Sequence, residues 1–197
     1  GHGDAMHLTV FDPSSDKLQV WACHENRRDG SSLRDAATGK VIFQIKSKDD
    51  VGRCMAADID PTNPGLEMWS SDSRGIRNIK GEVVKPKNQQ SGNEDTGNDN
   101  TALYIRGVRV STNFAIWWDG DLLRELLDAA RVSKYNWNTG QSDIVTRFEG
   151  CQWNNGTKSN PCVSADILGD WREEVLTRTT DSNELRLYVT PFPTDHR

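Results

Sequence analysis

Acidic side chains recur at short spacing in several turns of the sequence, and they are the first residues whose types could do chemistry. Calcium takes roughly six to eight oxygen ligands from carboxylates, carbonyls and water, so Asp-rich turns suit it. The spacing differs from an EF-hand loop, and one such turn alone is equally typical of an aspartate that accepts backbone hydrogen bonds. Their repetition favours metal binding. The candidate calcium sets are Asp58 with Asp60 and Glu67, Asp166 with Asp170 and Glu174, and Asp119 with Asp121.

The turn Asn154-Asn155-Gly156-Thr157-Lys158 is a second candidate site. Asn-Gly favours a tight turn that presents backbone amides, and the side chains of Asn154 and Thr157 offer hydrogen bonds beside the Lys158 cation. The same residues are typical of a surface hairpin, and Asn155 to Thr157 also match a glycosylation sequon. The residues alone therefore leave both a surface turn and a polar binding site open.

An internal repeat indicates which elements must position these groups. The segments FDPSSDKLQVW (11–21) and IDPTNPGLEMW (59–69) align without a gap at an offset of 48 residues. ADILGDWREEVL (165–176) resembles the second segment, and NFAIWWDGDLLREL (113–126) lies between the two. Each unit predicts a short strand, an Asp-rich turn, a second strand, a Gly turn and a further strand. That order and size are typical of a β-propeller blade.

The repeat predicts an all-β fold, with about four blades in one domain over 1–197 that is a fragment of a longer chain. Residues 121–132 carry leucines at helical spacing, but their place in the repeat favours strands. The polar segment 85–101 breaks the repeat and predicts an exposed loop. Trp21 and Trp69 occupy equivalent positions, and we expect them to pack between blades. The approximate blades are 1–50, 51–105, 106–158 and 159–197.

Composition argues against two classes of partner. Of the 197 residues 35% are hydrophobic, and no stretch approaches the roughly 20 apolar residues of a membrane-spanning helix. The formal net charge of −5 argues against a general basic surface for nucleic acid, so we expect neither membrane nor nucleic-acid partners. The four cysteines are spaced too irregularly for a zinc motif, and buried thiols and disulfides both stay open. They are Cys23, Cys54, Cys151 and Cys162, of which the last two would close a loop around the Asn-Gly turn.

Six motifs together resemble the rhamnogalacturonan lyases of polysaccharide lyase family eleven. They are GHGDAMH (1–7), HEN (24–26), AADIDPTNPGLEMWSS (56–71), NFAIWWDGDLLRELLD (113–128), NNGTK (154–158) and ADILGDWREEVLTR (165–178). The resemblance implies an eight-bladed, calcium-containing propeller that cleaves the rhamnose-galacturonate backbone of pectin by β-elimination, outside the cell or in the periplasm. This chain would supply about half of the propeller, and the missing blades would come from the same protein. Val10 stands where family members commonly carry an acidic residue, which weakens the expectation of a metal in the first unit.

Elimination at a uronate needs a base for the C5 proton and positive charge beside the adjacent carboxylate. A lysine serves as a base only when burial or a nearby cation lowers its pKa, and calcium would act in that direction. Lys158 is the first choice for the base, and Arg74 is a candidate carboxylate clamp or second base, although it is as typical of a solvated loop. The expected substrate contacts are Asn154, Asn155, Gly156 and Thr157. His2, Asp4 and His24 are expected to line the central channel and are further candidate metal ligands.

The chief alternative is a non-catalytic, calcium-stabilised propeller that serves as a binding or adhesion module. The lysine of the NNGTK turn separates the two hypotheses, because elimination requires a base and adhesion does not. A third hypothesis is that the isolated chain is inactive because absent blades complete its substrate groove. Trp117, Trp118 and Trp153 could stack on sugar faces, although strand alternation turns one of the first two inward.

Overall fold

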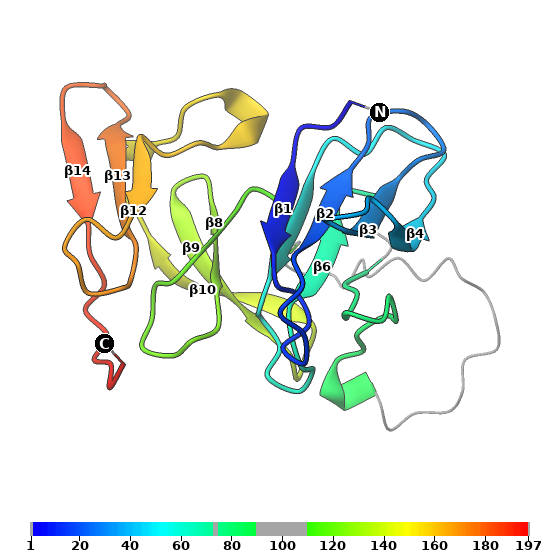
Figure 1. The fold of residues 1–197 in the computed structure, drawn as a ribbon. Helices are drawn as coiled ribbons and strands as arrows, with labels where there is room; N and C mark the ends of the chain where they lie inside the picture. Colours follow the sequence, from blue (N-terminus) through cyan, green and yellow to red (C-terminus); the bar gives the residue numbers. More distant parts are fainter. Residues whose placement is uncertain (1, 73–74, 90–109, 197) are drawn as a thin grey trace.

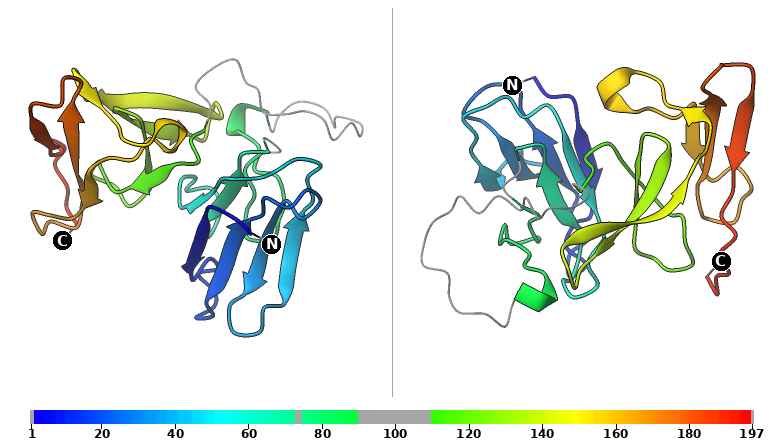
Figure 2. Two further views of the ribbon diagram at one scale, coloured as in Figure 1. Left: turned by 90° about the horizontal axis from the view of Figure 1, so that it is seen from above. Right: turned by 180° about the vertical axis from the view of Figure 1, so that it is seen from behind.

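The computed structural model describes residues 2–72, 75–89 and 110–196, whose strands form antiparallel sheets that follow one another in chain order (Figures 1 and 2). The first sheet is a four-stranded meander of β1 (Met6–Thr9), β2 (Gln19–Cys23), β3 (Ser31–Asp35) and β4 (Val41–Ile45). The third sheet repeats this order with β7 (Phe114–Ile116), β8 (Glu125–Asp128), β9 (Arg131–Asn136) and β10 (Gln141–Arg147). Residues 121–132 therefore contribute to β8 and β9, as the repeat predicts, and form no helix.

The second and fourth sheets are less regular. The second consists of β5 (Cys54–Ala57) and β6 (Glu67–Ser70), continued by single bridges from Met68 to Arg77 and from Arg77 to Val83. In the fourth sheet the central strand is β13 (Glu174–Thr179), with β14 (Leu185–Tyr188) on one edge. The other edge carries β11 (Cys151–Gln152) and β12 (Val163–Ala165). The described part contains two short 3-10 helices, η1 (Lys87–Gln89) and η2 (Gly156–Lys158).

This arrangement confirms an all-β protein with antiparallel sheets and almost no helix. Closure of the sheets into a propeller stays a prediction, as do the blade boundaries. Most of the expected polar loop lies at 90–101, outside the described residues. None of the helices in the described part is long and apolar enough to cross a membrane.

The two equivalent tryptophans join neighbouring sheets. Trp21 in β2 is fully buried and donates its indole N–H to the carbonyl of Trp69, at 3.3 Å. Trp69 in β6 is also buried, and it donates to the carbonyl of Ser111 just before the third sheet, at 2.8 Å. Their predicted packing between repeats is confirmed. In the third repeat Leu127 occupies the equivalent place, fully buried but without a donor.

A close approach between the first two repeats depends on Gly65. Its φ is 89°, and a Cβ atom there would lie 2.3 Å from the carbonyl oxygen of Phe11. Leu66 N donates to that same oxygen at 3.1 Å, so the backbone cannot move away without losing the bond. Only glycine fits this conformation and this distance together.

Gly65→Ala is expected to reduce the free energy of unfolding by about 2–3 kcal/mol, because backbone strain and a clash with Phe11 add. Gly39→Ala is the matched control. Gly39 also has a positive φ, 71°, but nothing lies within 4 Å of its Cβ position, so only the conformational cost of about 1 kcal/mol applies. Chemical denaturation of both variants measures the difference, and equal losses would contradict the close approach.

Candidate functional site

The candidate active site lies where the Asn-Gly turn meets the N-terminal segment. The turn forms η2, and its flanking residues Asn155 and Ser159 both adopt left-handed backbone angles, with φ of 53° and 52°. The Lys158 ammonium forms an ion pair with the carboxylate of Asp4, 154 positions earlier in the chain. In Figure 1 the gold segment that carries η2 reaches across from the fourth sheet toward β1. The fold thus joins two motifs from opposite ends of the chain.

Glu25 and His2 complete this cluster. His2 Nδ1 lies 2.8 Å from Glu25 Oε2, and one ligand atom from each of His2, Asp4 and Glu25 lies within 4.8 Å of the others. The segment is held in place because Glu25 N donates to the His2 carbonyl at 2.8 Å. The hydrogen bond from Lys158, together with its charge, lowers the pKa of Asp4. Lys158, Asp4, Glu25 and His2 are called the Lys158 cluster below.

His24 does not belong to this cluster, which corrects the expected grouping of His2, Asp4 and His24. Its Nε2 lies 3.1 Å from the hydroxyl of Ser32, and burial lowers its pKa. Glu25, the next residue, takes its place beside His2. Residues that are adjacent in an irregular segment point in different directions, so a motif such as HEN does not reveal which member reaches the site.

The turn residues beside Lys158 form hydrogen bonds within the turn and with residues next to it. Asn154 Oδ1 accepts a hydrogen bond from Arg178 Nε at 3.0 Å, and the Gly156 carbonyl accepts one from the indole of Trp153 at 2.9 Å. Lys158 N donates to the Asn155 carbonyl at 2.8 Å. The side chain of Thr157 and the whole of Arg74 lie outside the described residues, so their expected roles stay predictions.

A side-chain acceptor recurs at the same place in every sheet. In the last three sheets one side-chain oxygen accepts hydrogen bonds from two consecutive backbone N–H groups of the Asp-rich turn, at 2.8–3.1 Å. The first sheet carries a neutral amide instead, which accepts a bond from Phe11 N at 3.0 Å. The acceptors are Glu67, Glu125 and Glu174, each at most 1% exposed, and Gln19. Gln19 precedes Glu67 by the same 48 residues that relate Val10 to Asp58, so the repeat offset could have revealed this replacement.

The turn around Glu67 has features that fit a cation. Burial raises the pKa of Glu67 to about 8, and its Oε1 is buried without a hydrogen-bond partner among the described residues. Burial and the charges of Asp60 and Asp121 also raise the pKa of Asp58. Asp60 Oδ1 accepts from the backbone and hydroxyl of Thr62, at 2.9 and 2.6 Å. The three carboxylates do not converge to within 4.8 Å, so a calcium ion would have to draw them together.

Glu67→Gln is expected to stabilise the calcium-free protein increasingly as the pH rises from about 4.5 to about 8. The folded state holds the Glu67 proton more tightly than the unfolded state does, so wild-type stability is lost as that proton leaves. The amide, like Gln19, accepts hydrogen bonds without a charge. Thermal melts across this range with chelator present measure the difference between variant and wild type. Gln19→Glu should introduce a pH dependence of the same sign but smaller in the first sheet, because Gln19 is only partly buried, and a flat difference in both variants would contradict the buried charge.

Asp119 and Asp121 do converge, together with Glu125, but a lysine lies among them. Lys134 Nζ pairs with Asp119 Oδ2, with Asp121 Oδ2 at 2.7 Å and with Glu125 Oε1 at 2.9 Å. As they stand, these carboxylates do not fit a calcium ion, because the ammonium already supplies the positive charge. Neither Lys134 nor Glu125 was among the residues selected from the sequence.

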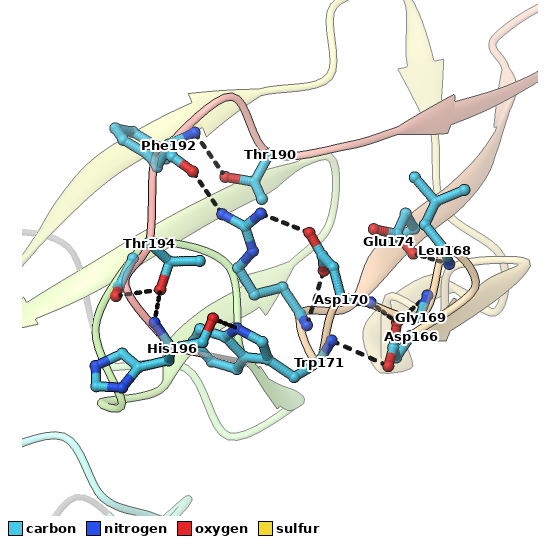
Figure 3. A network of polar contacts seen from close by, with 12 residues as sticks. Asp166, Leu168, Gly169, Asp170, Trp171, Glu174, Thr190, Phe192, Thr194 and His196 are labelled. Atoms are coloured by element: carbon cyan, nitrogen blue, oxygen red, sulfur yellow. Dashed lines mark hydrogen bonds and ion pairs between the residues drawn. The ribbon is translucent and has the colours of Figure 1, made fainter.

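The acidic residues of the fourth sheet cap a turn (Figure 3). Asp166 accepts bonds from the backbone N–H groups of Gly169, Asp170 and Trp171 at 2.7–3.1 Å. The Asp170 carboxylate pairs with Arg172 at 2.5 Å, and that hydrogen bond lowers the pKa of Asp170. These contacts satisfy the two carboxylates within the turn, and they do not converge with Glu174 to within 4.8 Å.

The aromatic candidates separate by exposure. Trp118 is 2% exposed and belongs to the core, whereas Trp117 is half-buried, so one of the two points inward as expected, although both follow the end of β7. The Arg124 guanidinium covers Trp117 at 3.5 Å from the ring centroid and pairs with Glu173 at 3.1 Å. Trp153 is the aromatic residue next to the Lys158 turn, through its bond to Gly156.

Comparisons with known proteins agree on one family. The family described as "Rhamnogalacturonan lyase family 11, C-terminal domain" matches residues 1–197. The rhamnogalacturonan endolyase YesW and the rhamnogalacturonan exolyase YesX, both from Bacillus subtilis (strain 168), are 46% and 40% identical to this chain over its whole length. The chain spans only 28% and 32% of these relatives.

Solved structures give the same result. The crystal structure of YesW superimposes with a TM-score of 0.84 at 45% identity, and the rhamnogalacturonan lyase PL11 of Bacillus licheniformis with 0.81 at 42% identity. Each match covers all of this chain and 30% of the other.

Proposed function

Because the chain belongs to rhamnogalacturonan lyase family 11, we propose that the complete protein is a rhamnogalacturonan lyase and that this chain supplies part of its active site. The relatives named above support this substrate, since both are lyases of rhamnogalacturonan. The observation that carries the proposal is the Lys158 cluster. A lysine and two carboxylates from distant segments meet there, which a surface hairpin does not require.

The proposed reaction is β-elimination at a galacturonate residue. Lys158 would take the C5 proton as the neutral amine, the bond from C4 to the leaving oxygen would break, and a 4,5-unsaturated uronate would remain. The ion pair with Asp4 positions the lysine side chain but favours its ammonium form, so Asp4 must release the lysine before it accepts a proton. Trp153 and Arg178 fix the turn that carries it, through their bonds to Gly156 and Asn154.

Calcium is part of the proposal because the cluster offers suitable ligands. The Asp4 and Glu25 carboxylates are oxygen donors that calcium prefers, and their ligand atoms already lie within 4.8 Å of each other. Because the Lys158 ammonium pairs with Asp4, calcium would have to displace it, which would also release the lysine. His2 fits better as the group that orients Glu25 than as a ligand, because calcium binds imidazole poorly. When bound, calcium would supply positive charge beside the substrate carboxylate.

The proposed architecture is about half of an eight-bladed propeller, with the remaining blades from the rest of the protein. The repeated sheets and the tryptophan bonds between neighbours support it. The proposed location is extracellular or periplasmic, since an intact pectic polysaccharide is too large to enter the cell.

The test of the proposed function is incubation of the complete protein with rhamnogalacturonan while ultraviolet absorbance is followed. We expect the absorbance of an unsaturated uronate to rise, and chelator to abolish the rise until calcium is restored. Binding of the polysaccharide without any unsaturated product would favour the adhesion module instead. Cleavage that yields only saturated ends would replace elimination by hydrolysis.

Calcium is also expected to stabilise the fold. It should raise the free energy of unfolding by about 2.7 kcal/mol at a concentration about 100 times its Kd, because it binds only the folded state. The Asp58→Asn/Asp60→Asn double variant should lose most of that gain, and Asp166→Asn/Asp170→Asn less, because those carboxylates are already satisfied. The control is Asp12→Asn. Asp12 corresponds to Asp60, but its turn carries Val10 and Gln19 where the second repeat has Asp58 and Glu67, so this variant should leave the effect of calcium unchanged. Identical melting curves with calcium and with chelator would refute the stabilisation.

A further inference from the structure

Two cysteines from neighbouring sheets converge on one backbone atom. Cys23 Sγ in β2 and Cys54 Sγ in β5 lie 3.5 and 3.4 Å from the carbonyl oxygen of Ala5. Both side chains are 1% exposed, and both are free thiols. Strands β2 and β5 pack against each other although they belong to different sheets. Since each thiol is directed at the same oxygen, their sulfur atoms are brought toward each other across the junction between the sheets.

The two thiols differ in how readily they ionise. A hydrogen bond from the Cys54 side chain lowers the pKa of Cys23 to about 7. The pKa of Cys54 is raised by its interaction with Cys23 and by burial. One sulfur is therefore suited to act as a nucleophile. While both thiols are protonated they donate to Ala5 O, and when Cys23 ionises the Cys54 hydrogen turns from Ala5 O to the thiolate until the pair reacts.

We propose that Cys23 and Cys54 form a redox-active pair that closes to a disulfide between the first two sheets, and that in its reduced form the pair anchors the backbone beside Asp4. Because both thiols are buried, closure requires local opening of the surrounding segment, followed by exchange with a low-molecular-weight disulfide. The Cys23 thiolate attacks one of its sulfurs and releases a thiolate, and Cys54, on losing its proton, then displaces the second thiol. Two protein thiols and one small disulfide become one protein disulfide and two small thiols, so hydrogens and electrons balance.

The anchoring follows from the position of Ala5, which directly follows Asp4. Ala5 O accepts bonds from both thiols and a long one, 3.4 Å, from Cys23 N. Gly3, on the other side of Asp4, packs so tightly that a Cβ atom there would lie 2.0 Å from the Cys23 carbonyl oxygen. Oxidation removes both S–H donors and leaves the long backbone bond. Any effect of this anchoring on Lys158, the partner of Asp4, rests on the proposed function, whereas formation of the disulfide does not.

The first test is peptide mapping of the complete protein after equilibration with reduced and oxidised glutathione. Trypsin should release Cys23 in residues 18–27 and Cys54 in residues 54–74. We expect these two peptides to become cross-linked, with the loss of two hydrogens, and the melting temperature of the oxidised protein to rise by at least about 2 °C. Free peptides throughout, including under oxidised glutathione alone, would overturn the proposal.

Cys151 provides the matched control, because it is also buried but its Sγ contacts the hydroxyl of Tyr188, at 3.2 Å. Cys151→Ser should leave the cross-link intact, and Cys23→Ala should abolish it. A second readout is amide exchange at residues 3–6, which we expect to be several-fold faster in the oxidised protein. Equal exchange in both forms would overturn the anchoring of the segment. Neither readout uses lyase activity, so their failure is distinct from failure of the proposed function.

Discussion

Lys134→Met is expected to reduce the free energy of unfolding of the complete protein by about 3–5 kcal/mol in the absence of calcium, because removing one member of a buried ion pair leaves uncompensated charge. The carboxylate that loses most stabilisation is that of Glu125, which is fully buried and whose Oε1 lies 2.9 Å from the Lys134 ammonium. Methionine keeps the length of the side chain, so the loss measures charge more than packing. Chemical denaturation at neutral pH gives the value.

A second substitution separates charge from shape. Glu125→Gln in the Lys134→Met background should recover much of the loss, because an amide still accepts the two backbone hydrogen bonds without needing a cation. Burial raises the pKa of Glu125 to about 7 even beside Lys134, so acidification should also reduce the loss in Lys134→Met as the carboxyl takes up a proton. A loss under about 1 kcal/mol that does not vary with pH would show that Lys134 is a surface ion pair.

Lys158→Ala in the complete protein is expected to lower kcat by about 100-fold or more, the scale of a positioned general base. KM should change less, because the rest of the turn and the missing part of the protein would still hold the substrate. Initial rates from the absorbance of the unsaturated product, over a range of substrate concentrations, separate the two constants.

Lys158→Arg is the sharper variant, because a guanidinium keeps the charge that pairs with Asp4 but does not release a proton at neutral pH. A base should fail in this variant, and a cation that only grips the substrate should survive it. Lys40→Arg and Lys40→Ala, at an exposed position before β4, control for the loss of one lysine. Near-normal turnover of Lys158→Arg would reduce Lys158 to a substrate contact and assign the base elsewhere.

The sequence predicts the sheets better than the site because the two depend on different kinds of information. Strand alternation and the 48-residue offset are local, so they place Trp21 and Trp69 correctly between repeats. Whether the side chains of a site come together depends on how separate segments of the chain pack against each other. Nothing near Asp119 or Asp121 in the sequence indicates that the strand after Glu125 returns Lys134 to them.

The Lys158 cluster shows the same division. Lys158 and Asp4 were each selected, but their contact spans nearly the whole chain and follows from no pattern. Glu25 was missed because the choice between two adjacent residues depends on backbone direction. By contrast, Gln19 could have been recognised from the repeat alone, since the alignment that identifies Val10 also opposes Gln19 to Glu67.

The tryptophan bonds have a consequence for how the molecule loses its structure. Each indole reaches forward to a carbonyl of the following repeat, from Trp21 to Trp69 and from Trp69 to Ser111. Leu127 has no such donor, and it shares a buried apolar cluster with Cys151 and Val175 of the fourth sheet instead. Coupling between adjacent units of this kind makes stability a sum over nearest neighbours, as in a one-dimensional lattice. Neighbouring repeats then tend to melt together, and the junction after the third depends on apolar packing and on the two hydrogen bonds between Trp117 and Glu173 rather than on an indole.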